Sequence, residues 1–586
     1  MKHLIDTLIL AAAATALLFQ ACSHRIPDGE YRIELLSTGD VHGAWFDSTY
    51  TGGGVRRSLY AVKAVVDSVR EAAGEDKVVF LDAGDCLQGD NAPYYYNYID
   101  TLSPHLFPQI CAYMGYDAVA VGNHDIETGH KVYDKVAKEL ADKGIPFLGG
   151  NAFRDEGKGT YFTDHVILRK GRLRIAVLGY TNPNMKEWLM ENLWSGMHFE
   201  SLIPLVQKDV DKVRAEEKPD VVIVVCHSGS GNGDGKELEN QGLDLFKSLR
   251  GVDFVIGAHD HRPYTALADS IAYIDGGSKA SNLGHGTLTL VYKRGIAVSR
   301  KISCGLIPID KTKIDTAMSR HFHDDYLKVK TFSTQPVGTL SRDIFTRDAF
   351  KGQSPYINFV HYIQLSCKPA QISMAAPLSY DKVLKAGELR YNDLFTIYPY
   401  ENQLFVIKMS GEEIKNYLEY SYDLWIKTAG KTGEPVLNIT KKADERFGAD
   451  KWSFVNRSYN FDSAAGLDYS VDVTKPKGER ISIKSLADGT PFDTKGTYNV
   501  ALTSYRASGG GGILREGAGV DTDKISERTV AVYPEIRSIV FNYLKENGSL
   551  DIEKTSDEKV IGTWNFLPQP YAGERIEKDF KVVFGD

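Results

Sequence analysis

Short apolar runs alternate with amphipathic stretches along the first half of the chain. Seven runs rich in β-branched and aromatic residues predict strands at Tyr31–Ser37, Lys77–Leu81, Ala118–Val121, Leu173–Leu178, Val221–Cys226, Phe254–Ile256 and Ala272–Ile274. Between several of them, apolar residues recur with the period of a helix over Val55–Ala73, Val132–Lys143 and Ile203–Glu217. Strands that alternate with helices are typical of an α/β sandwich with a layered sheet.

Near residue 305 the pattern changes. Lys311–Lys330 is polar and compatible with a helix, and an Xaa-Pro pair follows it, which predicts a linker helix over residues 306–335. Further helices are expected near Tyr356–Leu365 and Gly411–Ile426. The predicted domains are residues 30–305, an α/β domain, and residues 336–586, an α+β domain.

The composition excludes several classes of function. The 586 residues are enough for two to four domains, and the 11% of aromatic residues exclude a disordered chain. The net charge of −8 argues against binding of duplex nucleic acid. A small anionic ligand would therefore need positive charge within its own site, such as that of metal ions. The six cysteines show no paired spacing, which indicates neither a disulfide framework nor a thiolate zinc site.

The first 22 residues have the features of a bacterial export signal. A basic start precedes an apolar run from Leu4 to Phe19, which is broken only by Asp6 and is shorter than the ~20 residues of a membrane span. Leu18 to Cys22 resembles a lipobox, which predicts lipidation of Cys22; an ordinary cleaved signal is the alternative. No acidic run follows and no later segment is apolar enough to span. We therefore expect a periplasmic protein that lipid alone anchors to a bacterial membrane, the outer one.

Five short polar clusters each follow directly after a predicted strand. They are Gly39–Gly43, Gly84–Cys86, Gly122–Asp125, Cys226–Ser228 and Gly257–His261. Strand ends of an α/β sheet meet at one edge, where such folds bind ligands. The clusters supply carboxylate, imidazole and amide groups, a mixture suited to divalent metals such as Zn, Mn or Fe(II). Residues two apart in such a loop can reach one ion, as for Asp40 with His42 and His259 with His261.

Each cluster alone has a common structural explanation. Asp40 and His42 are compatible with a surface turn, and Asn123 can cap a helix. Cys226 and His227 can form a satisfied pair in the core. Five such clusters, each after a strand, are much less expected by chance. The set therefore favours one shared metal site over five separate structural roles.

The order of these clusters resembles that of the calcineurin-like metallophosphoesterase superfamily, over residues 30–305. The resemblance implies a four-layer α/β sandwich with a centre of two divalent ions, which are Zn, Mn, Fe or Co. It implies that the ligands of one ion are Asp40, His42, Asp85 and His261. It implies that the ligands of the second ion are Asp85, Asn123, His227 and His259, so that Asp85 bridges the two.

The same resemblance implies a catalytic role for His124. This side chain would reach the phosphoryl oxygen or the leaving group as an electrostatic partner or a general acid. In the bacterial nucleotidase branch, an Asp three positions later orients this histidine. Glu127 occupies that place here, while Asp125 lies next to His124. The catalytic pair that the resemblance implies is therefore His124 and Glu127.

The region after about residue 335 resembles the C-terminal domain of the periplasmic 5′-nucleotidase family, which forms the nucleotide pocket. The matching segments are Tyr391–Phe395, Tyr398–Asn402 and Tyr505–Gly510. The resemblance implies that Tyr400 and Tyr505 sandwich a base, and that Ser508 and Gly509 bind substrate. A base stack contributes about 1–3 kcal/mol whatever the base. Without the resemblance, packing in the core or on the surface explains a single tyrosine.

One segment departs from the 5′-nucleotidase pattern. Those enzymes carry an Asn-Gly-Gly-Gly-Ile-Arg stretch whose Arg clamps the substrate phosphate, whereas Ser373–Leu378 has neither an Arg nor a glycine run. This segment and Asp462–Ile481 resemble the branch of the 2′,3′-cyclic-nucleotide 2′-phosphodiesterase/3′-nucleotidases. The resemblance implies a phosphoesterase that hydrolyses 2′,3′-cyclic nucleotides and 3′-nucleotides to nucleosides and phosphate.

Two alternatives stay open at this point. A 5′-nucleotidase or nucleotide-sugar pyrophosphatase on the same scaffold follows if Arg390 or Arg506 replaces the absent clamp. A non-catalytic nucleotide-binding lipoprotein is the second alternative, and it would need no pair of metal ions. The expected partners are a nucleotide substrate and the membrane, the latter through the lipid anchor, and the oligomeric state is left open.

Overall fold

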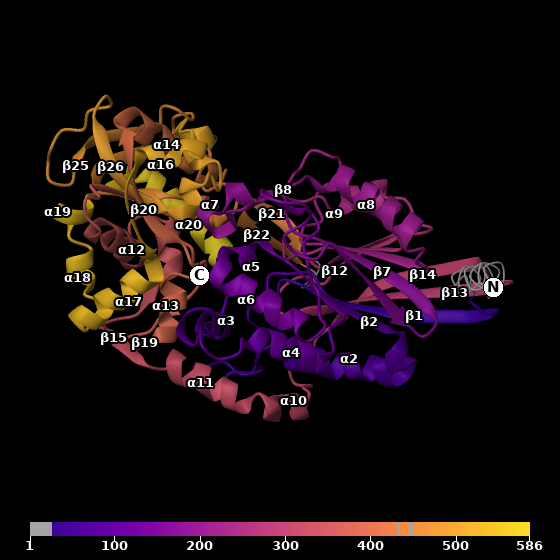
Figure 1. Cartoon of the computed structure of the whole chain (residues 1–586). Helices are drawn as coiled ribbons and strands as arrows, with labels where there is room; N and C mark the ends of the chain where they lie inside the picture. Colours follow the sequence, from indigo (N-terminus) through magenta and orange to yellow (C-terminus); the bar gives the residue numbers. More distant parts are fainter. Residues whose placement is uncertain (1–25, 431–433, 445–448, 586) are drawn as a thin grey trace, which may run out of the picture.

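The computed structural model of the protein describes residues 26–430, 434–444 and 449–585. The predicted export signal and the lipidation site Cys22 lie outside these residues, so both stay predictions. No helix among the described residues is long and apolar enough to cross a membrane. The chain forms two domains side by side, the N-terminal one in indigo to magenta and the C-terminal one in orange to yellow (Figure 1).

Two six-stranded sheets form the centre of the N-terminal domain, with the orders β14-β13-β1-β2-β3-β4 and β11-β12-β10-β9-β7-β6. The strands of the first sheet are β1 (Gly29–Thr38), β2 (Val78–Asp82), β3 (Ala118–Ala120), β4 (Phe147–Leu148), β13 (Asn282–Lys293) and β14 (Ile296–Pro308). Those of the second are β6 (His165–Lys170), β7 (Leu173–Tyr180), β9 (Val221–Cys226), β10 (Phe254–Ile256), β11 (Tyr264–Leu267) and β12 (Ala272–Asp275). Strands β1 to β4 run parallel, and so do β7, β9, β10 and β12, so the carboxyl ends within each group share an edge.

Alternate residues of each strand face opposite layers. In β2, Val79 and Leu81 pack between the two sheets, while Val78 and Phe80 pack against the outer helices. These helices are α2 (Leu59–Ala73), α4 (Leu106–Met114) and α6 (His130–Ala141) over the first sheet, and α8 (Leu202–Glu216) and α9 (Gly242–Ser248) over the second. The four-layer α/β sandwich is therefore confirmed, and all seven predicted strands form.

The C-terminal domain is built on a five-stranded sheet with the order β23-β17-β26-β20-β27. Its strands are β17 (Ile372–Ala375), β20 (Gln403–Ser410), β23 (Ser463–Ala465), β26 (Thr497–Thr503) and β27 (Thr529–Glu535). Helices α14 (Gly411–Trp425) and α20 (Tyr571–Phe584) pack with one face of β20, and α12 (Pro355–Ser366) and α17 (Ile536–Asn547) with the other. The two helices predicted in this region are thus confirmed as α12 and α14.

Two helices, α10 (Thr316–His321) and α11 (His323–Ser333), occupy the segment for which the sequence predicts one linker helix. They run along the lower side of the molecule in Figure 1. Phe322 interrupts them with φ −99° and ψ 18°, and its side chain is buried in the core of the N-terminal domain. Burial of this ring stabilises the break. The bounds of the linker and of the two domains stay predictions.

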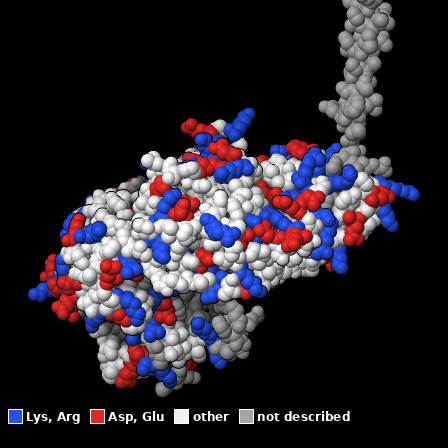
Figure 2. Space-filling view, turned by 90° about the horizontal axis from the view of Figure 1, so that it is seen from below, with Lys and Arg blue, Asp and Glu red and all other residues white. Residues whose placement is uncertain are grey.

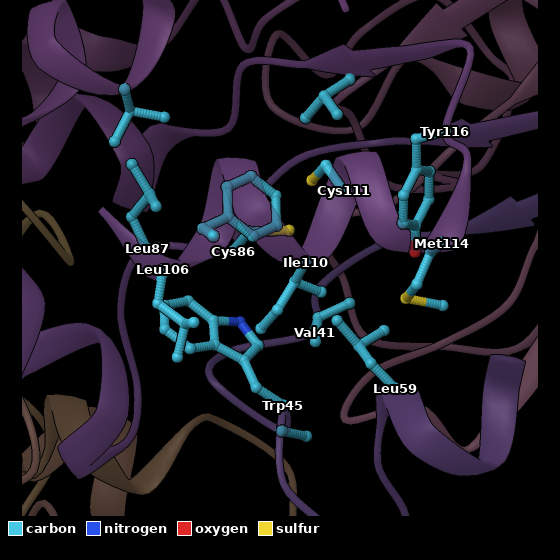
Figure 3. Close-up of a cluster of buried hydrophobic side chains, with 14 of the residues drawn as sticks. Val41, Trp45, Leu59, Cys86, Leu87, Leu106, Ile110, Cys111, Met114 and Tyr116 are labelled. Atoms are coloured by element: carbon cyan, nitrogen blue, oxygen red, sulfur yellow. The ribbon is translucent and has the colours of Figure 1, made fainter. Parts of the chain in front are cut away.

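A hydrophobic cluster lies directly beneath the loops that leave β1 and β2 (Figure 3). Val41, which separates two of the predicted metal ligands, is fully buried in it. Cys86 and Leu87, which directly follow a third ligand, are fully buried as well. Burying an aliphatic side chain contributes about 1.5–3 kcal/mol. The apolar neighbours therefore hold the polar residues of these loops in place.

Charged side chains are mixed on the face that Figure 2 shows. Lys and Arg are interspersed there with Asp and Glu over both domains, without a broad area of one sign. This face therefore does not create a strong field for a phosphate group.

Candidate active site

The predicted metal ligands lie together at strand ends of both sheets. Asp40 and His42 follow β1, Asp85 follows β2, and His259 and His261 follow β10. All five have left-handed backbones, with φ values of 49°, 46°, 61°, 85° and 61° in chain order. Such a conformation costs a non-glycine residue on the order of 1–3 kcal/mol. Nine non-glycine residues in the described part of the chain have a positive φ, and five of them are these ligands, so the strain concentrates where a function would need it.

The first ligand set consists of Asp40, His42 and His261. Their ligand atoms all lie within 4.8 Å of one another. Asp40 Oδ1 is 4.0 Å from His42 Nε2 and 3.8 Å from His261 Nε2, and the two nitrogens are 2.9 Å apart. This carboxylate oxygen is buried without a hydrogen-bond partner among the described residues. A buried charged oxygen without a donor is costly, so the three groups fit a cation that binds between them.

The second set consists of Asp85, Asn123, His227 and His259. Asp85 Oδ2 is 3.1 Å from His227 Nε2. Asn123 Oδ1 is 3.1 Å from the same nitrogen and 2.8 Å from His259 Nδ1. Asp85 Oδ2 is also 3.9 Å from His42 Nε2, so Asp85 stands between the two sets. The fold therefore brings all seven predicted ligands into one site.

Hydrogen bonds behind the imidazole rings determine which nitrogen faces the site. Nδ1–H of His227 donates to the carbonyl oxygen of Ala83, at 2.7 Å. Nδ1–H of His42 donates to the carbonyl oxygen of Gln88, at 3.2 Å. Both rings therefore turn Nε2 toward the site, and a metal ion binds this nitrogen once it has lost its proton.

His259 is oriented by two residues that the sequence analysis missed. Its Nε2 lies 3.0 Å from Glu239 Oε1, so Nε2–H donates to this carboxylate and Nδ1 faces the site. Its ring stacks on Trp188, with centroids 5.0 Å apart and planes 25° apart. Burial alone would raise the pKa of Glu239, but the hydrogen bond and the charge of His259, together with the charge of Arg457, lower it overall. Glu239 therefore stays ionised as the acceptor behind this ligand.

The two aspartates cannot both ionise easily in this environment. Burial raises the pKa of Asp40 well above its ordinary value; the charge of His227 opposes this rise and that of Asp85 adds to it. Burial acts on Asp85 in the same direction, but the charges of His227, His124 and His42 and the hydrogen bond from His227 together lower the pKa of Asp85. Like charges in a buried site disfavour each other. Divalent ions at the two sets would supply the positive charge that stabilises both carboxylates.

Asp125 holds the loop that carries Asp85. Its carboxylate accepts hydrogen bonds from four backbone N–H groups, at 2.8–3.0 Å, which belong to Asp85, Cys86, Leu87 and Gly122. The side chain is 1% exposed, and these four bonds occupy its carboxylate. Asp125 therefore fixes the backbone of the metal loop. The sequence analysis did not assign this role.

His124 lies beside the shared carboxylate. Its backbone N–H donates to Asp85 Oδ1 at 2.8 Å, and its Nδ1 lies 2.5 Å from Glu127 Oε2. Burial alone would lower the pKa of His124, but Asp85 and then Glu127 raise it to about 10. The imidazole is therefore protonated at neutral pH. Glu127 thus contacts His124 from the place where the nucleotidase pattern has an Asp, whose side chain is one methylene shorter.

The two predicted base-stacking residues are half-buried in the C-terminal domain. A third aromatic residue, which the sequence analysis missed, lies near both of them. The ring of Tyr459 contacts that of Tyr505 edge-on, with centroids 6.5 Å apart. Burial and then the phenol of Tyr459 raise the pKa of Tyr400 to about 12. The three tyrosines therefore form one aromatic group, and Tyr459 is an additional candidate for base contact.

Arg506 is not available to bind a phosphate. Its guanidinium makes two hydrogen bonds to the Asp462 carboxylate, at 2.7 and 3.0 Å, and donates to the carbonyl oxygens of Tyr459 and Gly510 and to Asn460 Oδ1. These bonds use all five donors of the group. The alternative that Arg506 replaces the absent clamp is therefore wrong. Arg390 is exposed and pairs with Glu388 at 3.1 Å.

Ser508 and Gly509 lie where the two domains touch. The hydroxyl of Ser508 donates to the carbonyl oxygen of Glu187, at 3.3 Å. A Cβ added to Gly509 would lie 3.0 Å from the Glu187 carboxylate. Both residues are buried in this contact. Their predicted part in substrate binding stays a prediction.

Comparison with known families agrees with this geometry. Residues 33–263 match the calcineurin-like phosphoesterase family, and residues 333–516 match the C-terminal domain of 5′-nucleotidases. The chain belongs to the calcineurin-like phosphoesterases of the 5′-nucleotidase family. It is therefore a nucleotide phosphoesterase, and its two His/Asp clusters are consistent with the dinuclear metal site that is typical of this family.

Individual relatives are distant. The trifunctional nucleotide phosphoesterase of Bacillus subtilis is 24% identical over 92% of this chain, which spans only 39% of that longer protein. The 2′,3′-cyclic-nucleotide 2′-phosphodiesterase/3′-nucleotidase of Haemophilus influenzae is 22% identical over 92% of this chain and 87% of its own length. Among solved structures, a 5′-nucleotidase-type protein from Staphylococcus aureus has a TM-score of 0.74 at 20% identity, over 91% of this chain and 99% of that one. The structural match shows the shared two-domain fold.

The position of Gly122 yields a test of the shared carboxylate. A methyl group on Gly122 would lie 2.1 Å from Asp85 Oδ1, so Gly122→Ala has to displace this carboxylate. We expect the metal affinity to fall by about 10- to 100-fold or more. The variant should therefore retain less metal after gel filtration, which elemental analysis measures. Gly305→Ala is the control, because a Cβ there meets nothing within 4 Å. Equal metal content in both variants would contradict the role of Asp85.

Proposed function

We propose that this enzyme hydrolyses 2′,3′-cyclic nucleotides to 3′-nucleotides and then releases phosphate to give nucleosides. Two divalent ions would be held by Asp40, His42, Asp85 and His261 on one side and by Asp85, Asn123, His227 and His259 on the other. When bound, such ions clamp the phosphoryl group and lower the pKa of a water that lies between them. The buried oxygen of Asp40 without a hydrogen-bond partner and the Nε2 atoms that His227 and His42 turn toward the site support this assignment.

The residues around the ions would then do three things. His124, protonated and held by Glu127, stabilises negative charge on the phosphoryl or leaving oxygen and can donate a proton to it. Tyr400 and Tyr505 hold the base by stacking, which positions the phosphate over the metal centre. Asp125 keeps the loop of Asp85 rigid throughout.

The choice of substrate rests on the segment that replaces the clamp and on Arg506. In Ser373–Leu378, which replaces the clamp segment, the hydroxyl of Ser373 donates to Gln364 at 2.8 Å within the core, and Met374 is fully buried. Arg506 uses all its donors within its own domain. A 5′-phosphate loses a strong bidentate contact under these conditions. A cyclic or 3′-phosphate lies closer to the base and is presented in a different pose. The similarity to the 2′,3′-cyclic-nucleotide 2′-phosphodiesterase/3′-nucleotidase of Haemophilus influenzae supports the same choice.

We propose further that the chain is exported and that a lipid on Cys22 anchors it to the periplasmic face of the outer membrane. The apolar run before Cys22 and the lipobox-like Leu18 to Cys22 support this proposal. Cells given labelled palmitate should label the wild-type chain and not Cys22→Ala. Equal labelling of the two, or none of the wild type, would contradict the anchor.

Product analysis tests the substrate directly. Protein that lacks residues 1–22, loaded in parallel with Mn, Zn or Co, should release phosphate from 2′,3′-cyclic AMP and from 3′-AMP. It should turn over 5′-AMP and UDP-glucose at least about tenfold less efficiently, because one lost charge-assisted contact costs about 1.5–3 kcal/mol. Asp85→Asn is the inactive control. A preference for 5′-AMP would keep the metal chemistry but assign the chain to the 5′-nucleotidase alternative, whose fold it shares.

Removal of the base stack should separate recognition from chemistry. Tyr400→Ala and Tyr505→Ala should each lower kcat/KM for 2′,3′-cyclic AMP by about 5- to 150-fold, which corresponds to about 1–3 kcal/mol per stacked ring. Turnover of bis(p-nitrophenyl) phosphate, which carries no base, should stay within about twofold of the wild type. Equal losses on both substrates would show that the tyrosines support the fold rather than the base.

A further inference from the structure

A short segment of the N-terminal domain, residues 182–190, contacts both the metal site and the C-terminal domain. It follows β7 and contains a single 3₁₀ turn, Met185–Glu187. Met185 is fully buried in the N-terminal core, which anchors the turn. Five residues later, Met190 packs against the core of the C-terminal domain. Residues 182–190 therefore belong to the packing of both domains.

Glu187 ties this segment to the loop that carries Tyr505. Its carboxylate pairs with the Arg515 guanidinium at 2.5 Å, and its carbonyl oxygen accepts the hydrogen bond of Ser508. Arg515 is held from its other side by Thr522, at 2.7 Å, and by Asp523, at 3.0 Å. Ser508 lies three residues after Tyr505, and its single hydroxyl proton is shared between the carbonyl oxygens of Tyr505, at 3.0 Å, and Glu187, at 3.3 Å. The position of Glu187 is thus linked to the position of residues 505–509, which are called the base-binding loop below.

The next residue, Trp188, faces the metal site. Its ring stacks on His259, which is also fixed at its edge by Glu239. Asn182, at the start of the same segment, donates to the carbonyl oxygen of Glu239 at 2.9 Å. One face and one edge of the imidazole are therefore held by groups that residues 182–190 supply or position. A displacement of this segment would change the direction in which His259 presents Nδ1.

We propose that residues 182–190 couple the seating of the base-binding loop to the orientation of His259, with Glu187 and Trp188 as positioning residues. The inference rests on the proposed nucleotide site and adds a link between base recognition and metal binding. The side chains of Glu187 and Arg515 are 25% and 33% exposed. Exposed pairs of this kind contribute little to stability, so the pair should act mainly on the coupling. We therefore expect a ligand of the base site to tighten metal binding. By linkage, the metal then tightens binding of that ligand by the same factor.

Calorimetric titration with Mn²⁺, with and without saturating adenosine, measures this coupling without turnover. In the wild type, adenosine should lower the Kd of the weaker Mn²⁺ site by at least about fivefold. Glu187→Gln and Arg515→Gln should each remove this effect, so that the Kd is the same with and without adenosine. The control is Arg528→Gln, which breaks a comparably exposed pair with Glu413 at 2.9 Å inside the C-terminal domain and should keep the full effect.

Trp188 is tested in the same titration. Trp188→Leu should weaken Mn²⁺ binding about tenfold even without adenosine, and Trp188→Phe, which keeps a stacking ring and the fold, should restore most of it. An unchanged Kd in both variants would overturn the role of Trp188. Adenosine that binds the wild type without changing the Mn²⁺ Kd, or a full effect in Glu187→Gln, would overturn the coupling. The proposed function fails separately, if the wild type binds Mn²⁺ and adenosine but does not hydrolyse the cyclic nucleotide.

Discussion

Two buried carboxylates placed among imidazoles are the constraint on which this structure depends. Asp40 and Asp85 are at most 1% exposed, and their charges oppose each other. The protein balances this cost partly with His227, whose Nε2 lies 3.1 Å from Asp85. Asp40 Oδ1 has no hydrogen-bond donor among the described residues, and a bound cation would satisfy it. The geometry of the surrounding loops serves to keep these oxygens and nitrogens aimed at one small volume.

Parts of the chain without a catalytic role hold these ligand atoms in position. Left-handed backbones turn the ligands inward, and Asp125 binds four N–H groups of the loop that carries Asp85. The hydrophobic cluster beneath, with Val41 and Leu87 fully buried, resists any displacement of these loops. Metal-dependent catalysis requires that the ligands are held rigidly and that the groups behind them have their hydrogen bonds satisfied. In the other domain, Arg506 donates to the carbonyl oxygen of Tyr459 and pairs with Asp462, so it holds the aromatic group and is not free to bind a phosphate.

The sequence predicts much of this arrangement because strands and the polar residues at their ends are local signals. All seven predicted strands of the sandwich form, and the seven predicted ligands meet. Glu239, Trp188 and Tyr459 were missed because each acts through a contact between segments far apart in the chain, and nothing in their own neighbourhoods marks them. The β13–β14 hairpin was missed as well, although buried and half-buried residues alternate along much of β13, a pattern that is typical of a strand. The break at Phe322 depends on burial in a distant core, which local helix propensity does not contain.

The shared position of Asp85 is the central claim, and anomalous scattering from crystals grown with Mn²⁺ tests it most directly. We expect two anomalous peaks about 3.5–4 Å apart, with the Asp85 carboxylate between them. One peak should lie at Asp40, His42 and His261, and the other at Asn123, His227 and His259. A single peak, or two peaks of which only one contacts Asp85, would contradict the account.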